Sequence, residues 1–150
     1  LPGAGEAIAE LNRKGYRAIV ITNQACVGRG DLMPADLDGI HRLMLEHIAK
    51  ADGKIDSIYV CPHIDADDCD CRKPRPGLIE QAYADYGFDR EATWMIGDSD
   101  KDIEAALAAG CRAALVRSDK QVQTPLQTGV SVFDNLPAFV RHLEERQKQT

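Results

Sequence analysis

Three cysteines and one histidine lie within eleven residues of the sequence and could together bind a metal ion. They are Cys61, His63, Cys69 and Cys71. Three thiolates and one imidazole make the Cys₃His set that completes a tetrahedral zinc shell. Aspartates occupy most of the positions between them, which is too polar a composition for buried core cysteines. The pattern predicts a zinc-clamped loop with a structural ion, because a full protein shell leaves no open position for water.

A cationic run follows this loop directly and leads into a predicted helix. Arg72, Lys73 and Arg75 stand just before Pro76 and Gly77. Fixed cations beside the free N–H groups of a helix start make a natural anion site. A solvated basic turn explains the same run. We give the two interpretations equal weight, because a metal-clamped loop would hold the cations in place.

Carboxylates follow a predicted strand further along the chain. Asp98, Asp100 and Asp102 come after the apolar run Trp94-Met95-Ile96 and Gly97. Ligands of open α/β sheets bind beyond the carboxyl ends of the strands, and carboxylate oxygens suit Mg²⁺. Taken alone, these aspartates are better explained as helix caps, since Asp98 to Asp100 would accept bonds from the first N–H groups of the next helix.

A hydroxyl and two amides end another predicted strand, because Thr22, Asn23 and Gln24 follow Ala-Ile-Val-Ile. A hydroxyl and exposed N–H groups at such a place can hold a phosphoryl oxygen. The same residue types are common in turns that have no function, so this signal is weak by itself. Arg29, between Gly28 and Gly30, is equally well explained as a solvated loop residue.

Alternating helical and strand patterns must position these side chains. Helices are predicted at 5–14, 34–51, 77–86, 101–109 and from Leu136 to Leu143, and strands at 17–22, 58–60, 94–96, 113–116 and 130–133. In the helix at 34–51 the apolar positions Leu37, Ile40, Leu43, Met44 and Ile48 recur at spacings of three and four and predict one buried face. Short β-branched strands are typical of parallel sheets, so the class is α/β.

Composition excludes several functions. The 150 residues include 18 Lys and Arg against 24 Asp and Glu, a net charge of −6, which argues against a broad basic face for nucleic acid. A hydrophobic fraction of 44% supports a packed core, and no apolar run approaches the roughly 20 residues that span a membrane. No secretion signal opens the chain. We expect a monomeric, cytoplasmic protein that binds neither nucleic acid nor membrane and acts on a small molecule.

The order of the motifs resembles the haloacid dehalogenase (HAD) superfamily of phosphotransferases. Thr22-Asn23, Lys73 within Arg-Lys-Pro, and Gly97-Asp98-x-x-x-Asp102 look like its second, third and fourth motifs. With the Gly28-Arg29-Gly30 turn, the cysteine motif and the Pro-Gly after the lysine, the chain is similar to the D-glycero-D-manno-heptose 1,7-bisphosphate 7-phosphatases. Histidinol-phosphate phosphatases share the zinc motif and Arg-Lys-Pro and are the alternative, but the Gly-Arg-Gly turn and Pro-Gly favour the heptose enzymes.

The resemblance implies a Rossmann-like, three-layer parallel sheet with helices on both faces, formed by one domain over residues 1–150. It implies a Mg²⁺-dependent phosphatase acting on a phosphorylated sugar of the ADP-heptose and lipopolysaccharide core route. Thr22 and Lys73 would be the catalytic residues that hold the phosphoryl group, Asp98 would bind Mg²⁺, and Asp102 would support them. The substrate-binding residues would be Thr22, Asn23, Gln24, Ala25, Arg72, Lys73 and Ser99.

Three departures from the family pattern stand out. Ala25-Cys26 occupies the place where the family commonly has Ser-Gly, and Ser99 stands where it often has lysine. The superfamily's first motif, a strand followed by Asp-x-Asp-Gly, carries the nucleophile and is not found before the first helix. The match at 36–39 falls in the predicted amphipathic helix, and we interpret it as helix surface.

We therefore expect a domain that is incomplete at its N-terminus, with two exposed sheet edges and no aspartate nucleophile among these residues. From another functional class, a non-catalytic, zinc-stabilised sugar-phosphate-binding module explains the same motifs. A metal-stapled fragment without activity is the third interpretation, and it predicts unfolding on chelation.

Overall fold

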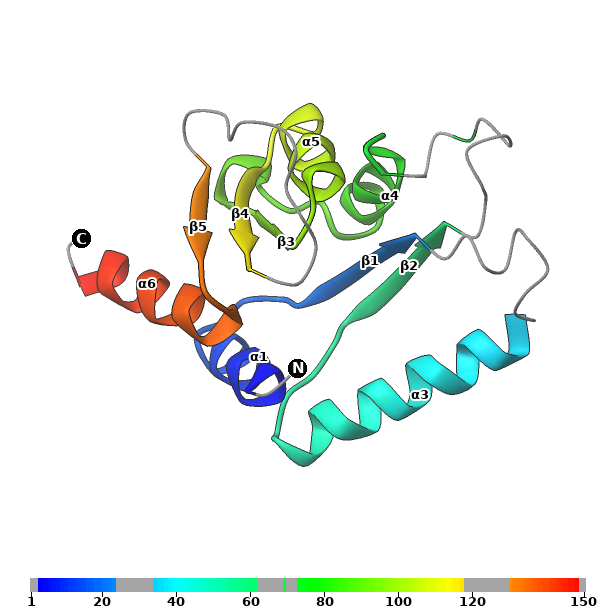
Figure 1. Cartoon of the computed structure of the whole chain (residues 1–150), viewed down its shortest axis with the longest axis horizontal. Coiled ribbons are helices and arrows are strands. Elements are labelled where there is room, and N and C mark those ends of the chain that lie inside the picture. The colour runs from blue at the N-terminus through cyan, green and yellow to red at the C-terminus, as the bar shows by residue number, and fades with distance from the viewer. Residues whose placement is uncertain (1–2, 24–33, 62–68, 70–72, 118–129, 149–150) are drawn as a thin grey trace. The chain divides into compact units, whose positions relative to one another are not determined.

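A computed structural model describes residues 3–23, 34–61, 69, 73–117 and 130–148 (Figure 1). The chain divides into two compact units, one of residues 1–64 with 136–150 and the other of residues 65–135. The strand pairs within these described ranges are all parallel, which confirms the predicted α/β class. Among the described residues the strands form two sheets, in the orders β1-β2 and β3-β4-β5.

The first unit contains α1 (Ala4–Arg13), β1 (Ile19–Asn23), α3 (Pro34–Lys50), β2 (Ser57–Cys61) and α6 (Leu136–Lys148). β1 and β2 pair in register from Ile19 opposite Ser57 to Asn23 opposite Cys61. α1 packs against both α3 and α6, and its buried Ala7, Ala9 and Leu11 share this core with Phe139, Val140 and Leu143. The helix at 34–51 is confirmed, and Asp38 and Gly39 lie within it as expected.

The predicted apolar face of α3 is only partly buried. Ile48 is buried near the end of the helix, where Gly5 and Gly53 allow α1 to approach closely. Ile40 and Leu43 are 53% and 67% exposed, so the expectation of a continuous buried stripe is wrong at these two positions. Ile40 and Leu43 lie away from this contact, because α1 approaches α3 closely at the C-terminal end of α3.

The second unit contains α4 (Gly77–Tyr86), the 3₁₀ helix η2 (Arg90–Ala92), β3 (Trp94–Gly97), α5 (Asp100–Ala108), β4 (Arg112–Val116) and β5 (Ser131–Phe133). β4 lies between β3 and β5, and its Ala113, Ala114 and Leu115 are buried. α5 packs against β3 and β4 through the alanine-rich face that its sequence predicts. This packing fixes the start of α5 at the carboxyl end of β3.

Arg90 ties three elements of this unit together. Its guanidinium donates to both carboxylate oxygens of Glu80, at 2.7 and 2.6 Å, and to the carbonyl of Ala109 at 2.9 Å. It also lies 4.0 Å from the centre of the Tyr83 ring. Tyr83 is 39% exposed, and the Arg90 guanidinium lies over its ring.

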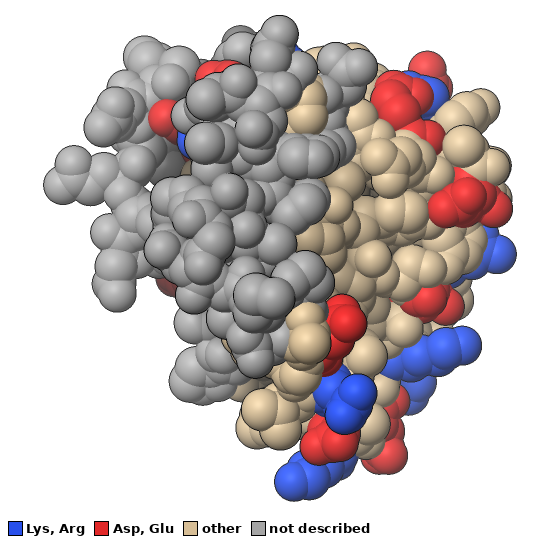
Figure 2. Space-filling model, turned by 90° about the vertical axis from the view of Figure 1, so that its right-hand side faces the viewer, with Lys and Arg blue, Asp and Glu red and all other residues tan. Residues whose placement is uncertain are grey.

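Charged side chains of both signs are interspersed on the surface. On the face drawn in Figure 2, the described Asp and Glu side chains lie among those of Lys and Arg, with no broad area of either sign. No helix in the described part of the chain is long and apolar enough to cross a membrane.

Candidate functional site

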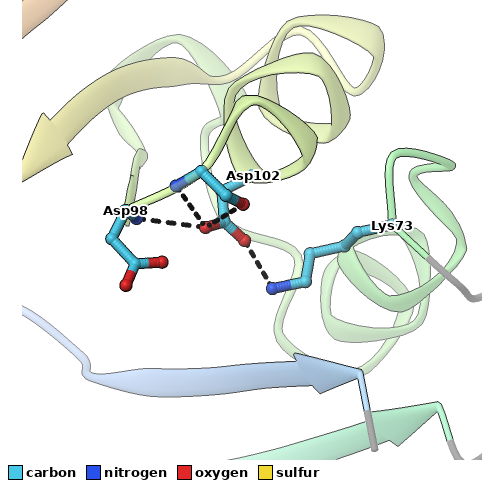
Figure 3. Close-up of polar contacts among 4 residues, drawn as sticks. Lys73, Asp98 and Asp102 are labelled. Carbon is cyan, nitrogen blue, oxygen red and sulfur yellow. Dashed lines mark hydrogen bonds and ion pairs between the residues drawn. The ribbon is translucent and has the colours of Figure 1, made fainter. Parts of the chain in front are cut away.

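Asp102 is the centre of a polar cluster at the carboxyl end of β3 (Figure 3). Among the residues that the structure describes, it is the one charged side chain that is buried, at 5% exposure. Its Oδ2 accepts bonds from the backbone N–H of Asp98 at 3.1 Å, from the backbone N–H of Ser99 at 3.3 Å and from the Ser99 hydroxyl at 3.0 Å. A buried carboxylate is stable only with such partners, so these bonds offset the cost of removing it from water.

Lys73 completes the set by donating from Nζ to Oδ1 of Asp102. Its side chain is 14% exposed, and it reaches the end of β3 from the loop that precedes α4. Opposite charges that are largely removed from water are costly unless they are paired and hydrogen-bonded, as Lys73 and Asp102 are here. The pair therefore fixes an ammonium group at the carboxyl end of the strand.

Asp98 uses its backbone and its side chain differently. Its N–H points at Asp102, whereas its carboxylate points away from Asp102 in Figure 3. The residue is half-buried and comes directly after β3. A carboxylate held in this way at a strand end has the hard oxygen chemistry that Mg²⁺ prefers. Asp98 therefore fits the predicted magnesium role.

The start of α5 is capped within the predicted stretch 98–100. Ser99 is the N-cap residue, and the Asp102 carboxylate at the third helical position accepts a bond from the Ser99 N–H. The sequence leaves two explanations for Asp98, Asp100 and Asp102, namely Mg²⁺ binding and helix capping. In the structure the Asp102 side chain belongs to the capping box, and the Asp98 side chain points away from it.

The other predicted site residues lie in several places. Thr22 and Asn23 end β1, opposite Val60 and Cys61 of β2. Cys61 is buried, Cys69 is half-buried, and neither is in a disulfide. The remaining predicted residues, Gln24, Ala25, His63, Cys71 and Arg72, lie outside the described residues. Among the described residues, no group of three or more His, Cys, Asp or Glu side chains is placed to hold a metal ion.

The structure thus brings together Lys73, Asp98, Ser99 and Asp102 within one unit. One member of the site was not predicted. Gly97 lies directly against the Asp102 carboxylate, and a Cβ built on it would fall 2.3 Å from Oδ2. The spacing Gly-Asp-x-x-x-Asp contains both residues, but it does not show that they touch.

Comparison with known proteins agrees with this arrangement. The HAD-hydrolase-like family matches residues 70–143, which include the whole cluster. A D-glycero-beta-D-manno-heptose-1,7-bisphosphate 7-phosphatase of Pseudomonas aeruginosa is 41% identical over 146 residues, or 95% of this chain and 82% of that protein. The chain belongs to this HAD-like phosphatase family.

Other members of the family confirm the motif-based recognition. The Escherichia coli K12 protein of the same name is 31% identical, over 99% of this chain and 82% of its own length. The crystal structure of the Bordetella bronchiseptica D,D-heptose 1,7-bisphosphate phosphatase, complexed with magnesium and phosphate, matches this structure with a TM-score of 0.92. That match has 35% identity and covers 97% of this chain and 84% of the Bordetella chain.

Proposed function

We propose that the protein is a Mg²⁺-dependent phosphomonoesterase that removes the 7-phosphate of D-glycero-D-manno-heptose 1,7-bisphosphate and leaves the 1-phosphate. The observation that carries the proposal is the Lys73 ammonium, paired with the buried Asp102 beside Asp98 at the carboxyl end of β3. The names of the relatives support the substrate, and the magnesium and phosphate in the Bordetella structure support the cofactor and the bound group.

Lys73 binds the phosphoryl group in this proposal. The charge of a transferring phosphoryl group is spread over its equatorial oxygens, and catalysis consists largely of positioning and charge stabilisation. An ammonium already held by Asp102 does not have to be ordered when the substrate arrives. Its low exposure also strengthens its interaction with an anion relative to an ammonium in water.

Asp98 holds Mg²⁺ through its carboxylate. When bound, the ion would neutralise negative charge on the phosphoryl oxygens. The chain keeps Asp98 in place by bonding its N–H to Asp102, so the ammonium and the metal ligand share one support.

The remaining roles rest on the family resemblance. Thr22 binds the phosphoryl group through its hydroxyl, Arg72 and Ser99 contact the substrate, and Asn23, Gln24 and Ala25 line the substrate loop. Cys61, His63, Cys69 and Cys71 hold a structural zinc ion, which the donor chemistry of the set supports. Cys61, Cys69 and Cys111 are outside disulfides, which supports a place in the reducing cytoplasm.

Turnover by the aspartyl-phosphate route needs a nucleophile, and these 150 residues offer no Asp-x-Asp-Gly after a strand. The test therefore compares the 150-residue chain with the same chain carrying a family-type strand and Asp-x-Asp-Gly joined in front of Leu1. We expect Mg²⁺-dependent phosphate release from the bisphosphate by the joined chain alone. Lys73→Met in the joined chain should abolish release, and Lys101→Met, a change at an exposed lysine of α5, should preserve it.

Two results would contradict this proposal. A joined chain that folds, contains zinc and releases no phosphate would favour a binding module without catalysis. A joined chain that releases phosphate equally well with Lys73→Met would remove Lys73 from the site.

A further inference from the structure

Gly97 lies so close to Asp102 that no residue with a side chain would fit at position 97 without displacing it. A Cβ added to Gly97 would lie 2.3 Å from both Cβ and Oδ2 of Asp102 and 2.4 Å from its Cγ, far inside van der Waals contact. The backbone does not require glycine here, because Gly97 is not among the residues with positive φ. Gly97 is the last residue of β3, and the extended backbone of a strand does not itself require glycine.

Asp102 cannot move aside to admit a larger residue. It lies in the first turn of α5, whose Ile103, Ala105 and Ala106 are buried, and α5 packs on both β3 and β4. Its Oδ2, one of the atoms nearest the added Cβ, accepts the bonds from Asp98 and Ser99. A methyl group at position 97 would therefore displace the carboxylate that supports the site.

We propose that Gly97 is a positioning residue of the active site: because it has no side chain, the Asp102 carboxylate can lie against it and hold the Lys73 ammonium and the backbone N–H groups of Asp98 and Ser99. Gly97 touches no reacting atom in this proposal and acts through Asp102. The link to phosphate binding rests on the proposed function, whereas the link to the Asp98 and Ser99 amides does not.

The test is Gly97→Ala with two readouts. The first is amide hydrogen exchange at Asp98 and Ser99, measured relative to the amides of β4, which report the stability of the same unit. The second is the affinity of the protein for inorganic phosphate, measured by calorimetry in Mg²⁺. We expect exchange at the two amides to accelerate about tenfold relative to β4, and phosphate to bind about tenfold more weakly, as for loss of a charge-assisted hydrogen bond.

Gly53→Ala is the matched control, because its added Cβ would lie 2.7 Å from Cγ2 of Ile48 in the other unit. It should destabilise the chain through the same kind of clash and leave both readouts unchanged. A second background, Asp102→Gly, removes the atoms that an alanine at 97 would meet. In that background Gly97→Ala should change neither readout further, because coupled residues give non-additive effects.

The outcomes are distinct. Unchanged exchange at Asp98 and Ser99 in Gly97→Ala overturns the positioning role, and so does an equal effect of Gly97→Ala in the Asp102→Gly background. Faster exchange in a protein whose unaltered form binds no phosphate would support the positioning role and overturn the proposed function.

Discussion

At the scale of single residues, the site depends on the ion pair between Lys73 and the buried Asp102. The family resemblance of the sequence implies functional roles for Lys73 and Asp98 and a supporting role for Asp102. It could not show that Asp102 would be buried, that it would accept bonds from two amides and a hydroxyl, or that Gly97 would leave it room. Those facts depend on how α5 follows β3, and the residue types and their spacing, taken alone, are better explained by an ordinary helix cap.

Removing the cation should leave Asp102 buried and unpaired. We expect Lys73→Met to lower the free energy of unfolding by about 3 kcal/mol, the cost of breaking a buried pair at one partner. Lys101→Met makes the same chemical change at an exposed position of α5 and should alter stability by less than about 0.5 kcal/mol. Urea unfolding of the two variants measures both values. Equal stability of the two variants would show that the pair is not buried in solution.

Substitutions of Asp98 and Asp102 should have different effects on stability and on Mg²⁺ dependence. Asp98→Asn retains the backbone N–H that bonds Asp102, so we expect a smaller loss of stability than for Asp102→Asn. The variant should lose the Mg²⁺-dependent part of its affinity for inorganic phosphate, because an amide is a weaker ligand than a carboxylate. Calorimetry with and without Mg²⁺ checks this. An unchanged magnesium dependence would assign the metal to other residues.

At the scale of elements, sequence patterns locate helices and strands well where glycine and apolar spacing agree. The helix at Gly77–Tyr86 is predicted with both ends correct, because Gly87 follows it with φ 61° and ψ 32° and donates its N–H to the Tyr83 carbonyl. The 3₁₀ helix at Arg90–Ala92 was missed, since three residues carry no periodicity. Exposure of Ile40 and Leu43 was missed because periodicity does not identify what packs against a helix.

Two glycines should respond in opposite directions to the same substitution. Gly87→Ala places a side chain in the left-handed region and should cost about 1 kcal/mol of stability. Gly39→Ala adds a methyl group within α3, where no atom of the described residues lies within 4 Å of it, and should add up to about 1 kcal/mol through helix propensity. Thermal unfolding of both variants measures the difference, and a shift of the same sign in both would contradict this account of the backbone.

The ion pair between Glu80 of α4 and Arg90 of η2 should give a pH-dependent contribution to the stability of the fold. The hydrogen bonds from Arg90 lower the pKa of Glu80 below its usual 4.5, against a smaller opposing effect of burial. Because the folded pKa is depressed, the contribution is complete above the unfolded pKa and is lost as the pH falls through the folded pKa.

We therefore expect Glu80→Gln to cost about 0.5 kcal/mol at pH 7, discounted for solvent exposure of the pair. The gap between the two proteins should shrink as the pH falls below 4.5. Glu104→Gln, an exposed change on α5, controls for lost charge. Melting temperatures of the unaltered protein and Glu80→Gln between pH 7 and pH 4 measure this difference in stability. A difference that grows on acidification would contradict the lowered pKa of Glu80.

At the scale of the whole molecule, the order of motifs was more informative than any single motif. Thr22-Asn23, Arg72-Lys73-Pro74 and Gly97-Asp98 are each weak, but their sequence along the chain led to the family that the relatives establish. In the described part of the chain, the division of the strands into sheets of two and three is set by long-range pairing, which local residue patterns encode poorly.

A zinc ion bound by the Cys₃His set would stabilise the folded chain as a whole. We expect one zinc ion per chain, and a melting temperature lower by about 10 °C or more after chelation, for a loss of a few kcal/mol. Metal analysis should find less zinc in Cys69→Ser and an unchanged content in Cys26→Ser, whose cysteine is outside the Cys₃His set. Full zinc content in Cys69→Ser would exclude the proposed set.

The most direct test of the proposed activity follows the two phosphates of D-glycero-D-manno-heptose 1,7-bisphosphate by ³¹P NMR, with the chain joined to a family-type Asp-x-Asp-Gly strand. We predict that the 7-phosphate signal is replaced by inorganic phosphate only with Mg²⁺, that the 1-phosphate signal persists, and that kcat/KM exceeds that for histidinol phosphate. Loss of the 1-phosphate, turnover without Mg²⁺, or a preference for histidinol phosphate would contradict the proposal.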